Sequence, residues 1–303
     1  MEFLVILLGF IVTSTWLKDV DRFDDGWFAR YQALMRGLAS RLGLGAERAA
    51  SVGLVLVYLG LLALTAVLEW AAGGVLYGLA TMALHLLILL FAMDRTQPGK
   101  IASEFLALWN SGERSGCVDY LAEELGARET LDPGDGAGLV AQFKRLLTYR
   151  SFERMFMMYT LYVVAGASGV VIGYVSYQLR SELCAEREEA LADRVDLLIS
   201  LLEWLPLRLL GITFSLVGDF TRCASLLKSQ LWRFESALQN SELLASWARA
   251  SLGEDSSSPS EPSPHADCDE AAMGREIESL KDLLERSQLV WLVFVALITL
   301  LLV

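Results

Sequence analysis

The chain has 303 residues, of which 54% are apolar and only 20% charged, and its mean hydropathy is +0.43. Soluble domains usually carry about 45–50% apolar and about 25% charged residues, so the surplus of apolar side chains must lie outside a soluble core. The net charge of −12 argues against a nucleic-acid partner, which needs a basic surface to release counterions from phosphate.

The first third of the chain contains three apolar runs. Phe3–Leu17 is short but uncharged, and it predicts an uncleaved membrane helix because neither a basic n-region nor a cleavage site accompanies it. Ser51–Glu69 and Val75–Met93 are each long enough to cross about 30 Å of hydrocarbon at about 1.5 Å per residue. The short break at 71–74 makes these two runs antiparallel neighbours in a helical hairpin.

Residues 95–154 have the pattern of small helices and not of a span. Apolar residues recur at helical spacing in Ile101–Asn110 and in Cys117–Gly126, and residues 132–136 (DPGDG) form a turn. We therefore expect a small helical subdomain here.

A glycine-containing span follows at Phe156–Leu179. Gly166, Gly169 and Gly173 share one face of this helix. Small residues let a neighbouring helix approach closely in membrane bundles, so we predict close helix packing on this face. The alternative is that the glycines only make the helix easier to deform.

The next apolar segment, Leu197–Val217, is long enough to span but holds Glu203, Pro206 and Arg208 near its centre. Proline kinks a helix, and a charged side chain at the bilayer centre costs on the order of 3 kcal/mol. We predict a broken membrane segment whose charges face the bundle interior. The alternative is a segment that lies partly in the membrane interface.

The rest of the chain has three parts. Residues 219–252 have the pattern of an amphipathic helix, and 253–270, rich in Ser, Pro and Glu, predicts a disordered linker because it has too few apolar residues to fold. Leu289–Val303 is an apolar membrane anchor at the end of the last part, 271–303.

Basic residues predict which loops face the cytoplasm. Lys18–Ala50 holds six Lys or Arg and Asp94–Arg154 holds eight, whereas the turn at 71–74 holds none. By the positive-inside rule both basic loops are cytoplasmic and the turn is periplasmic. The acidic loop Arg180–Asp196, with three basic residues, is then periplasmic if the segment after it spans.

These elements predict an all-α fold, a polytopic membrane helical bundle with a small cytoplasmic helical subdomain. We expect six divisions. Residues 1–94 hold three transmembrane helices with a basic loop, 95–154 a cytoplasmic helical loop, and 155–218 the glycine-containing span with the broken segment. Residues 219–252 form an amphipathic helix, 253–270 a linker, and 271–303 a C-terminal helix with its anchor.

Ionisable groups at membrane depth are functional candidates, because each needs a partner to offset its desolvation. His85 is a proton relay or ligand contact in one interpretation and a helix-packing histidine in the other. Glu153 and Arg154 precede a span, where a charged pair also marks the membrane interface. The candidate ligand-binding or functional residues are His85, Glu153, Arg154, Glu203, Pro206, Arg208 and Asp219.

A metal centre or a catalytic set is not expected. The four cysteines have no CxxC spacing, and the histidines are only His85 and His265. A structural zinc site needs about four clustered nitrogen or sulfur ligands. Glycine-rich phosphate loops and GxSxG are absent. We therefore expect no metal, no cofactor and no catalytic residue, and an enzyme is the less favoured class.

The stretch Leu202–Asp219, LEWLPLRLLGITFSLVGD, resembles the acidic-Trp-x-Pro-x-Arg segment of the AmpE family. The span with Gly166, Gly169, Gly173 and Tyr174 matches that family's glycine-containing span, and Leu84-His85-Leu86 before Asp94-Arg95 resembles its hairpin. The resemblance extends over nearly the whole length. It implies a protein of the bacterial inner membrane that regulates β-lactamase induction, in connection with peptidoglycan recycling and the antibiotic response.

AmpE proteins are similar in turn to the CobD/CbiB membrane enzymes of cobalamin synthesis. Those enzymes carry an early His-Pro motif, which this chain lacks, and an Asn in a Pro-Ala-Arg segment, where this chain has Leu205-Pro206-Leu207-Arg208. The resemblance therefore implies a membrane sensor or signal transducer. The alternatives are an adenosylcobinamide-phosphate synthase, or a transporter or structural membrane subunit. The expected partners are membrane lipid, a muropeptide or other small ligand, and a protein partner or second copy, but not nucleic acid.

Overall fold

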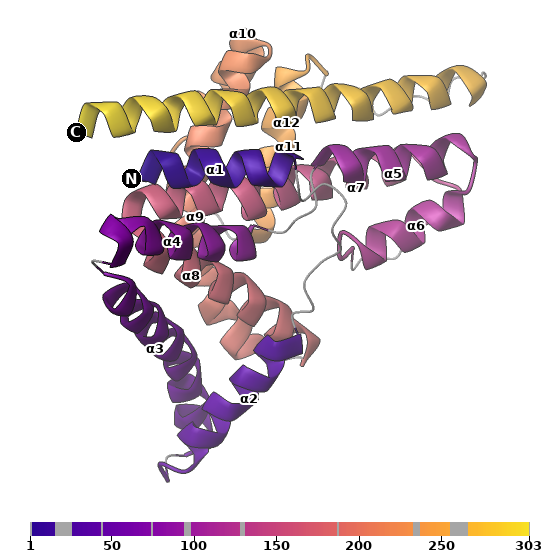
Figure 1. Ribbon diagram of the computed structural model, residues 1–303. Helices are drawn as coiled ribbons and strands as arrows, with labels where there is room; N and C mark the ends of the chain where they lie inside the picture. Colours follow the sequence, from indigo (N-terminus) through magenta and orange to yellow (C-terminus); the bar gives the residue numbers. More distant parts are fainter. Residues whose placement is uncertain are drawn as a thin grey trace. The chain divides into compact units, whose positions relative to one another are not determined.

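A computed structural model describes residues 2–15, 26–43, 45–73, 75–93, 98–127, 131–186, 188–232, 237–254 and 266–302. Among these residues every regular element is a helix, which confirms the predicted all-α fold (Figure 1). The chain divides into two compact units. Unit 1 comprises Met1–Arg95 and Met157–Glu203, and unit 2 comprises Thr96–Phe156 and Trp204–Val303.

Unit 1 contains the N-terminal helices and the glycine-containing segment. Its elements are α1 (Glu2–Thr15), α2 (Gly26–Ser40), α3 (Ala46–Ala72), the 3₁₀ turn η1 (Val75–Gly78), α4 (Leu79–Ala92), α8 (Met157–Ala185) and the first half of α9 (Glu189–Val217). The α3–α4 pair confirms the predicted helical hairpin.

Three described stretches are long and apolar enough to cross a membrane: Glu47–Ala72, Gly136–Ala185 and Glu189–Val217. The apolar parts of α1 and α4 are shorter. α4 therefore differs from the full span expected over Val75–Met93. Its first residues form η1 instead, and Gly78, at φ 89°, separates the two elements in a backbone conformation that favours glycine.

α2 folds back along α3 (Figure 1). The Tyr31 hydroxyl donates to the Val57 carbonyl at 3.0 Å and lies against Gly60. A Cβ at position 60 would overlap that hydroxyl, so the glycine leaves room for the Tyr31 side chain between the two helices.

α8 reverses direction at Ala165 and Gly166, whose backbone angles are not helical; Gly166 has φ 63°. Leu161 lies against Gly169 and Gly173, and Met158 also lies within 3.5 Å of a Cβ built on Gly173. In a straight helix positions eight and fifteen residues apart are separated by about 12 Å and about 22 Å.

These contacts therefore require the arm Met157–Val164 to fold back against the residues that follow the turn. The predicted close packing on the glycine face is present, but its partner belongs to the same chain segment. The long apolar stretch that contains α8 is consequently not one straight rod.

Ion pairs place the acidic loop 180–196 at the same end of unit 1 as the basic segment before α3. Arg36 pairs with Glu186 at 2.7 Å, and Arg194 pairs with Glu47 at 3.7 Å and donates to the Ser51 hydroxyl at 2.7 Å. The prediction that these two loops lie on opposite sides of the membrane is wrong. Counting basic residues missed that the carboxylates of one loop neutralise the arginine of the other.

Unit 2 contains the expected helical subdomain and the C-terminal part of the chain. Its elements are α5 (Pro98–Asn110), α6 (Arg114–Glu123), α7 (Gly136–Ser151), the π-helical turn η2 (Phe152–Phe156), the second half of α9, α10 (Phe220–Gln230), α11 (Ala237–Ser251) and α12 (Ala266–Leu302). The predicted turn before α7 is present, and Asp135 caps α7 by accepting a hydrogen bond from the Gly138 amide at 2.9 Å.

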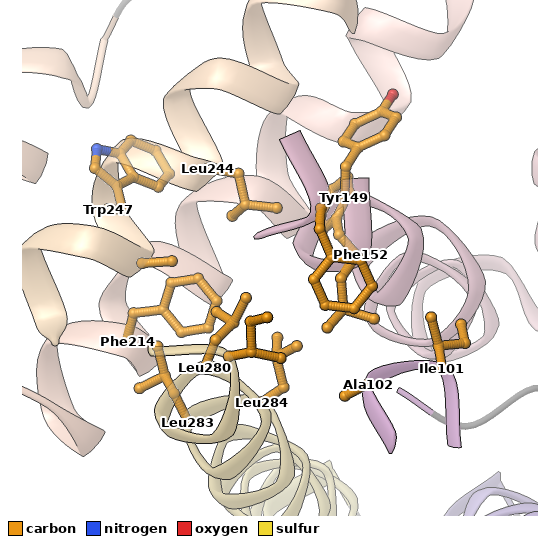
Figure 2. Close-up of a cluster of buried hydrophobic side chains, with 14 of the residues drawn as sticks. Ile101, Ala102, Tyr149, Phe152, Phe214, Leu244, Trp247, Leu280, Leu283 and Leu284 are labelled. Carbon is orange, nitrogen blue, oxygen red and sulfur yellow. The ribbon is translucent and has the colours of Figure 1, made fainter. Parts of the chain in front are cut away.

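A single apolar cluster forms the core of unit 2, and Figure 2 shows part of it. Phe105 of α5 stacks on Phe143 of α7 with ring centroids 3.9 Å apart. Trp291 of α12 packs edge-on against Phe156 and donates from its indole nitrogen to the Thr213 hydroxyl of α9 at 3.0 Å. The apolar end of α12 is thus held against the second half of α9.

Two predicted elements differ in the structure. The amphipathic helix over 219–252 is two helices, α10 and α11, that pack against each other. Of the linker 253–270, residues 255–265 lie outside the described residues and α12 already begins at Ala266.

α9 continues through Pro206 as one helix. The irregular backbone expected within 197–217 is found instead in α8, at Ala165 and Gly166. Glycine tolerates the positive φ of a sharp turn, whereas a proline within a helix removes one hydrogen bond without reversing the chain.

We predict from the ion pairs of unit 1 that exposed positions 40 and 189 face the same side of the membrane. In a background without native cysteines, the Ser40→Cys and Glu189→Cys variants should react with a membrane-impermeant thiol reagent added from one side. The Trp70→Cys variant, at the other end of α3 and at a position 84% exposed, should react only from the other side. Labelling of position 189 together with position 70 would contradict the fold of unit 1.

Candidate functional site

Three helices of unit 1 bring polar side chains together at one end of the unit. His85 of α4 lies between Glu69 of α3 and Tyr162 of α8. Its Nε2 is 3.1 Å from the Glu69 carboxylate, and its Nδ1 is 3.0 Å from the Tyr162 hydroxyl. We name these three residues the histidine triad. Both ring nitrogens of His85 thus have a partner on another helix, and the functional and packing interpretations of this residue both stay open.

The triad leads from a partly exposed group to a buried one. The side chains of Glu69 and His85 are 33% and 18% exposed, whereas Tyr162 is fully buried. A carboxylate only accepts, so a neutral imidazole donates from Nε2 to Glu69 and accepts at Nδ1 from the Tyr162 hydroxyl. The pair with Glu69 becomes an ion pair when the imidazole is protonated. The arrangement can therefore bind or pass a proton.

The arm of α8 that carries Tyr162 is the one that precedes the chain reversal. Tyr162 lies three residues before Ala165, and Val164 beside the turn is 67% exposed. Tyr159, one turn earlier on the same arm, is 2% exposed, and its hydroxyl has no hydrogen-bond partner within the described part of the chain. A buried hydroxyl without a hydrogen bond costs free energy, so this arm holds a polar group in apolar surroundings at an energetic cost.

A second polar contact in unit 1 involves Glu203, which is fully buried. The Tyr177 hydroxyl of α8 donates to its carboxylate at 2.8 Å. At the preceding residue of α8, the Ser176 hydroxyl lies 3.0 Å from the hydroxyl of Tyr58 of α3. These contacts hold α8 to α9 and to α3, as expected for polar groups in a helical bundle.

Arg208 belongs to unit 2, where it joins α9 to the end of α10. Its Nε donates to the Leu231 carbonyl at 3.0 Å, its Nη1 donates to the Trp204 carbonyl at 3.3 Å, and the side chain is 5% exposed. The guanidinium also lies 5.2 Å from the Trp204 ring centroid. These contacts indicate a structural role for Arg208, which holds α9 to the end of α10. Pro206, two residues before it, is buried.

Asp219, Glu153 and Arg154 belong to unit 2, whereas the histidine triad belongs to unit 1. Asp219 caps α10, accepts from the Arg222 amide at 3.1 Å and pairs with the Arg222 guanidinium at 3.6 Å. Glu153 and Arg154 are half-buried in η2. The predicted candidates are thus divided between the units, with His85 and Glu203 in unit 1 and the others in unit 2.

Sequence reasoning missed Glu69 and Tyr162. The sequence analysis considered Glu69 only as the last residue of a span. The signal that could have identified it is its position just before the tight hairpin turn, which places its carboxylate near α4. Nothing in the sequence pattern identified Tyr162 as a site residue, because only the chain reversal in α8 brings it to His85.

The three side chains of the histidine triad can hydrogen-bond and exchange protons with one another. Within the described residues, three or more His, Cys, Asp or Glu side chains do not gather in a way that could hold a metal ion. Burial raises the pKa of the Cys117 and Cys223 thiols, which suppresses thiolate chemistry at both.

One family model matches the chain over residues 41–301, and its description is "Regulatory signalling modulator protein AmpE". The match covers α3 to α12 and thus includes the histidine triad. Neither a curated protein nor a solved structure matches the chain.

The contacts of Arg208 predict a structural role that can be measured. Arg208→Leu leaves the Leu231 carbonyl without its donor, and an unsatisfied buried group costs about 1–3 kcal/mol. Arg114→Leu is the matched control, because Arg114 makes its cation–π contact with Trp109 on the helical subdomain. Thermal unfolding of the purified chain in detergent should show a clearly lower Tm for Arg208→Leu. Equal Tm values would contradict the assignment.

Proposed function

Because the chain belongs to the AmpE family, we propose that it is a multi-pass protein of the bacterial inner membrane that modulates signalling in β-lactamase induction. The signal is linked to peptidoglycan recycling and hence to the antibiotic response. The single observation that carries the proposal is the family match over 41–301, which spans nearly all described elements.

The fold supports a membrane location. α3 and α9 are apolar and long enough to cross a bilayer, and many of their large apolar side chains are exposed, as lipid-facing residues are. The apolar end of α12 shows the same property, with Leu289, Val293 and Leu297 exposed. Membrane lipid is therefore the partner that covers these faces.

The division into two units supports a modulator. Unit 1 carries polar contacts between apolar helices, whereas unit 2 contains the short helices α5, α6 and α7, which share one apolar core with the second half of α9 and with α10, α11 and α12. We propose that unit 1 receives a signal, in the form of a muropeptide or another small ligand, and that the helical subdomain of unit 2 passes it to a protein partner or a second copy in the cytoplasm.

The proposal predicts a loss of regulation when the gene is deleted. β-Lactamase activity should be measured by hydrolysis of a chromogenic cephalosporin before and after exposure to an inducing β-lactam. The deletion strain should show altered induction and altered β-lactam sensitivity, and the unmodified chain supplied in trans should restore both.

The matched control is the Gly37→Ala variant, which meets no neighbouring atom within 4 Å and should complement as well as the unmodified chain. Unchanged induction and sensitivity in the deletion strain would overturn the proposed function.

A further inference from the structure

Helix α2 presents an exposed face that is both apolar and basic. Leu34 and Leu38 lie one turn apart on this face and are 59% and 44% exposed, and Leu42, just after the helix, is 61% exposed. Arg30, one turn before Leu34, is exposed on the same face, and Arg41 is exposed beside Leu42. We name these five residues the outer face of α2. Exposed apolar side chains that gather in one patch often mark an interaction site.

The outer face has two arginine charges that an anionic partner can bind. Residues 26–42 contain three arginines and no acidic residue, although the whole chain has a net charge of −12. Arg36 is paired with Glu186 at 2.7 Å. Arg30 and Arg41, in contrast, make no ion pair within the residues that the structure describes. A negatively charged partner therefore suits this face.

The acidic loop 180–196 meets α2 on the opposite side. Arg36, which contacts this loop through Glu186, is two positions after Leu34 and hence about 200° around the helix from it. At the start of α3, Glu47 is paired with Arg194 of the same loop. Both of these carboxylates thus have basic partners of their own, and the acidic loop does not neutralise the outer face.

The inner side of α2 places the outer face beside the beginning of the apolar part of α3. The stem of Arg36 lies 3.4 Å from a Cβ built on Gly53, which is two residues inside the apolar run that begins at Ser51. Leu34 and Leu38 flank Arg36 along the helix, so they lie beside the first turns of this run, where a span meets the lipid headgroups. Arginine side chains at this level can reach phosphates while their stems cover apolar surface.

Contacts with α3 and α8 hold α2 in place. The Tyr31 hydroxyl donates to the Val57 carbonyl of α3 at 3.0 Å. The Trp27 ring stacks on the Tyr174 ring of α8 with centroids 6.4 Å apart, and Phe28 meets the same ring edge-on. Because the helix is already fixed, binding of a partner orders no further chain, which keeps its entropic cost low.

We propose that the outer face of α2 is a binding surface for anionic phospholipid. Leu34, Leu38 and Leu42 enter the boundary between headgroups and acyl chains, and Arg30 and Arg41 bind the lipid phosphates. A helix with exposed leucines and basic side chains on one face has this property at membrane surfaces. The inference goes beyond the proposed function, because it rests on the membrane location of unit 1 and not on a role in β-lactamase induction.

The test measures which lipid lies next to the outer face. Gly37 is exposed between Leu34 and Leu38, and a Cβ there meets no atom within 4 Å. The Gly37→Cys variant, in a chain whose native cysteines are replaced, carries an NBD fluorophore in nanodiscs of phosphatidylcholine and phosphatidylglycerol. Each lipid is supplied in turn as a trace that bears the same nitroxide quencher near its headgroup. Quenching by phosphatidylglycerol should be about fivefold stronger, as one or two basic residues at an anionic surface give.

Charge variants separate a lipid preference from mere proximity to the bilayer. The Arg30→Gln/Arg41→Gln variant should bring the quenching ratio close to one, because the label keeps its place while the attraction to phosphate is lost. The matched control, Arg114→Gln/Arg249→Gln, removes the same charge from exposed or partly exposed positions of unit 2 and should leave the ratio unchanged. Thermal unfolding establishes that each variant is folded.

The apolar part of the face is tested separately. Leu34→Ser/Leu38→Ser should weaken the quenching by both lipids and shift the NBD emission to longer wavelength, since the label then meets more water. The same fluorophore on Glu189→Cys, in the acidic loop, should show no preference for phosphatidylglycerol.

Four results would overturn the inference: a ratio near one at position 37, a preference that survives the arginine double variant, quenching that the serine double variant leaves unchanged, or no quenching by either lipid. The last result would show that water or protein covers the outer face. Because none of these measurements involves β-lactamase induction, a failure here is distinguishable from a failure of the proposed function.

Discussion

The arrangement of unit 1 depends on the packing of Leu161 against Gly169 and Gly173. It exists because Gly166 adopts a left-handed conformation that lets α8 reverse, and because two glycines leave room for the returning arm. A Cβ at position 169 would overlap the Leu161 carbonyl, which is backbone and cannot rotate away, so this glycine is the stricter requirement of the two. The reversal brings Tyr162 to His85 and lets residues 180–196 end beside α2.

Several polar groups in this apolar unit are held by partners on other helices. His85 has Glu69 and Tyr162, Glu203 has Tyr177, and each contact ties one helix to another. Hydrocarbon supplies no hydrogen-bonding partners, so such groups are satisfied by neighbouring helices or left at a cost of several kcal/mol. A change in any of these hydrogen bonds is therefore also a change in a contact between two helices. We propose that such contacts between helices link the polar groups of unit 1 to the signalling role of a member of the AmpE family.

Much of the fold follows from residue patterns. Apolar length indicates α3 and α9, the short 71–74 break indicates the α3–α4 hairpin, and the DPGDG turn indicates where α7 begins. The rest depends on contacts that periodicity does not contain. Glycines on one face indicate close packing, but they do not reveal that the partner is Leu161 of the same segment. The positive-inside rule counts basic residues and misses that Glu186 pairs with Arg36. Of the candidate site only His85 was identified from the sequence, because Glu69 and Tyr162 become its neighbours through the fold alone.

The reversal of α8 is tested most directly by chemical cross-linking of positions 158 and 173. A straight helix would separate them by about 22 Å, whereas the Met158 side chain lies within 3.5 Å of a Cβ built on Gly173. The Met158→Cys/Gly173→Cys double variant, in which only the flexible end of the Leu161 side chain must move aside, should cross-link with a short bifunctional thiol reagent, and the Met158→Cys/Ser181→Cys variant should not. Efficient cross-linking of the first pair alone is the predicted result. Failure of the first pair in a folded protein would show a continuous helix and contradict the account.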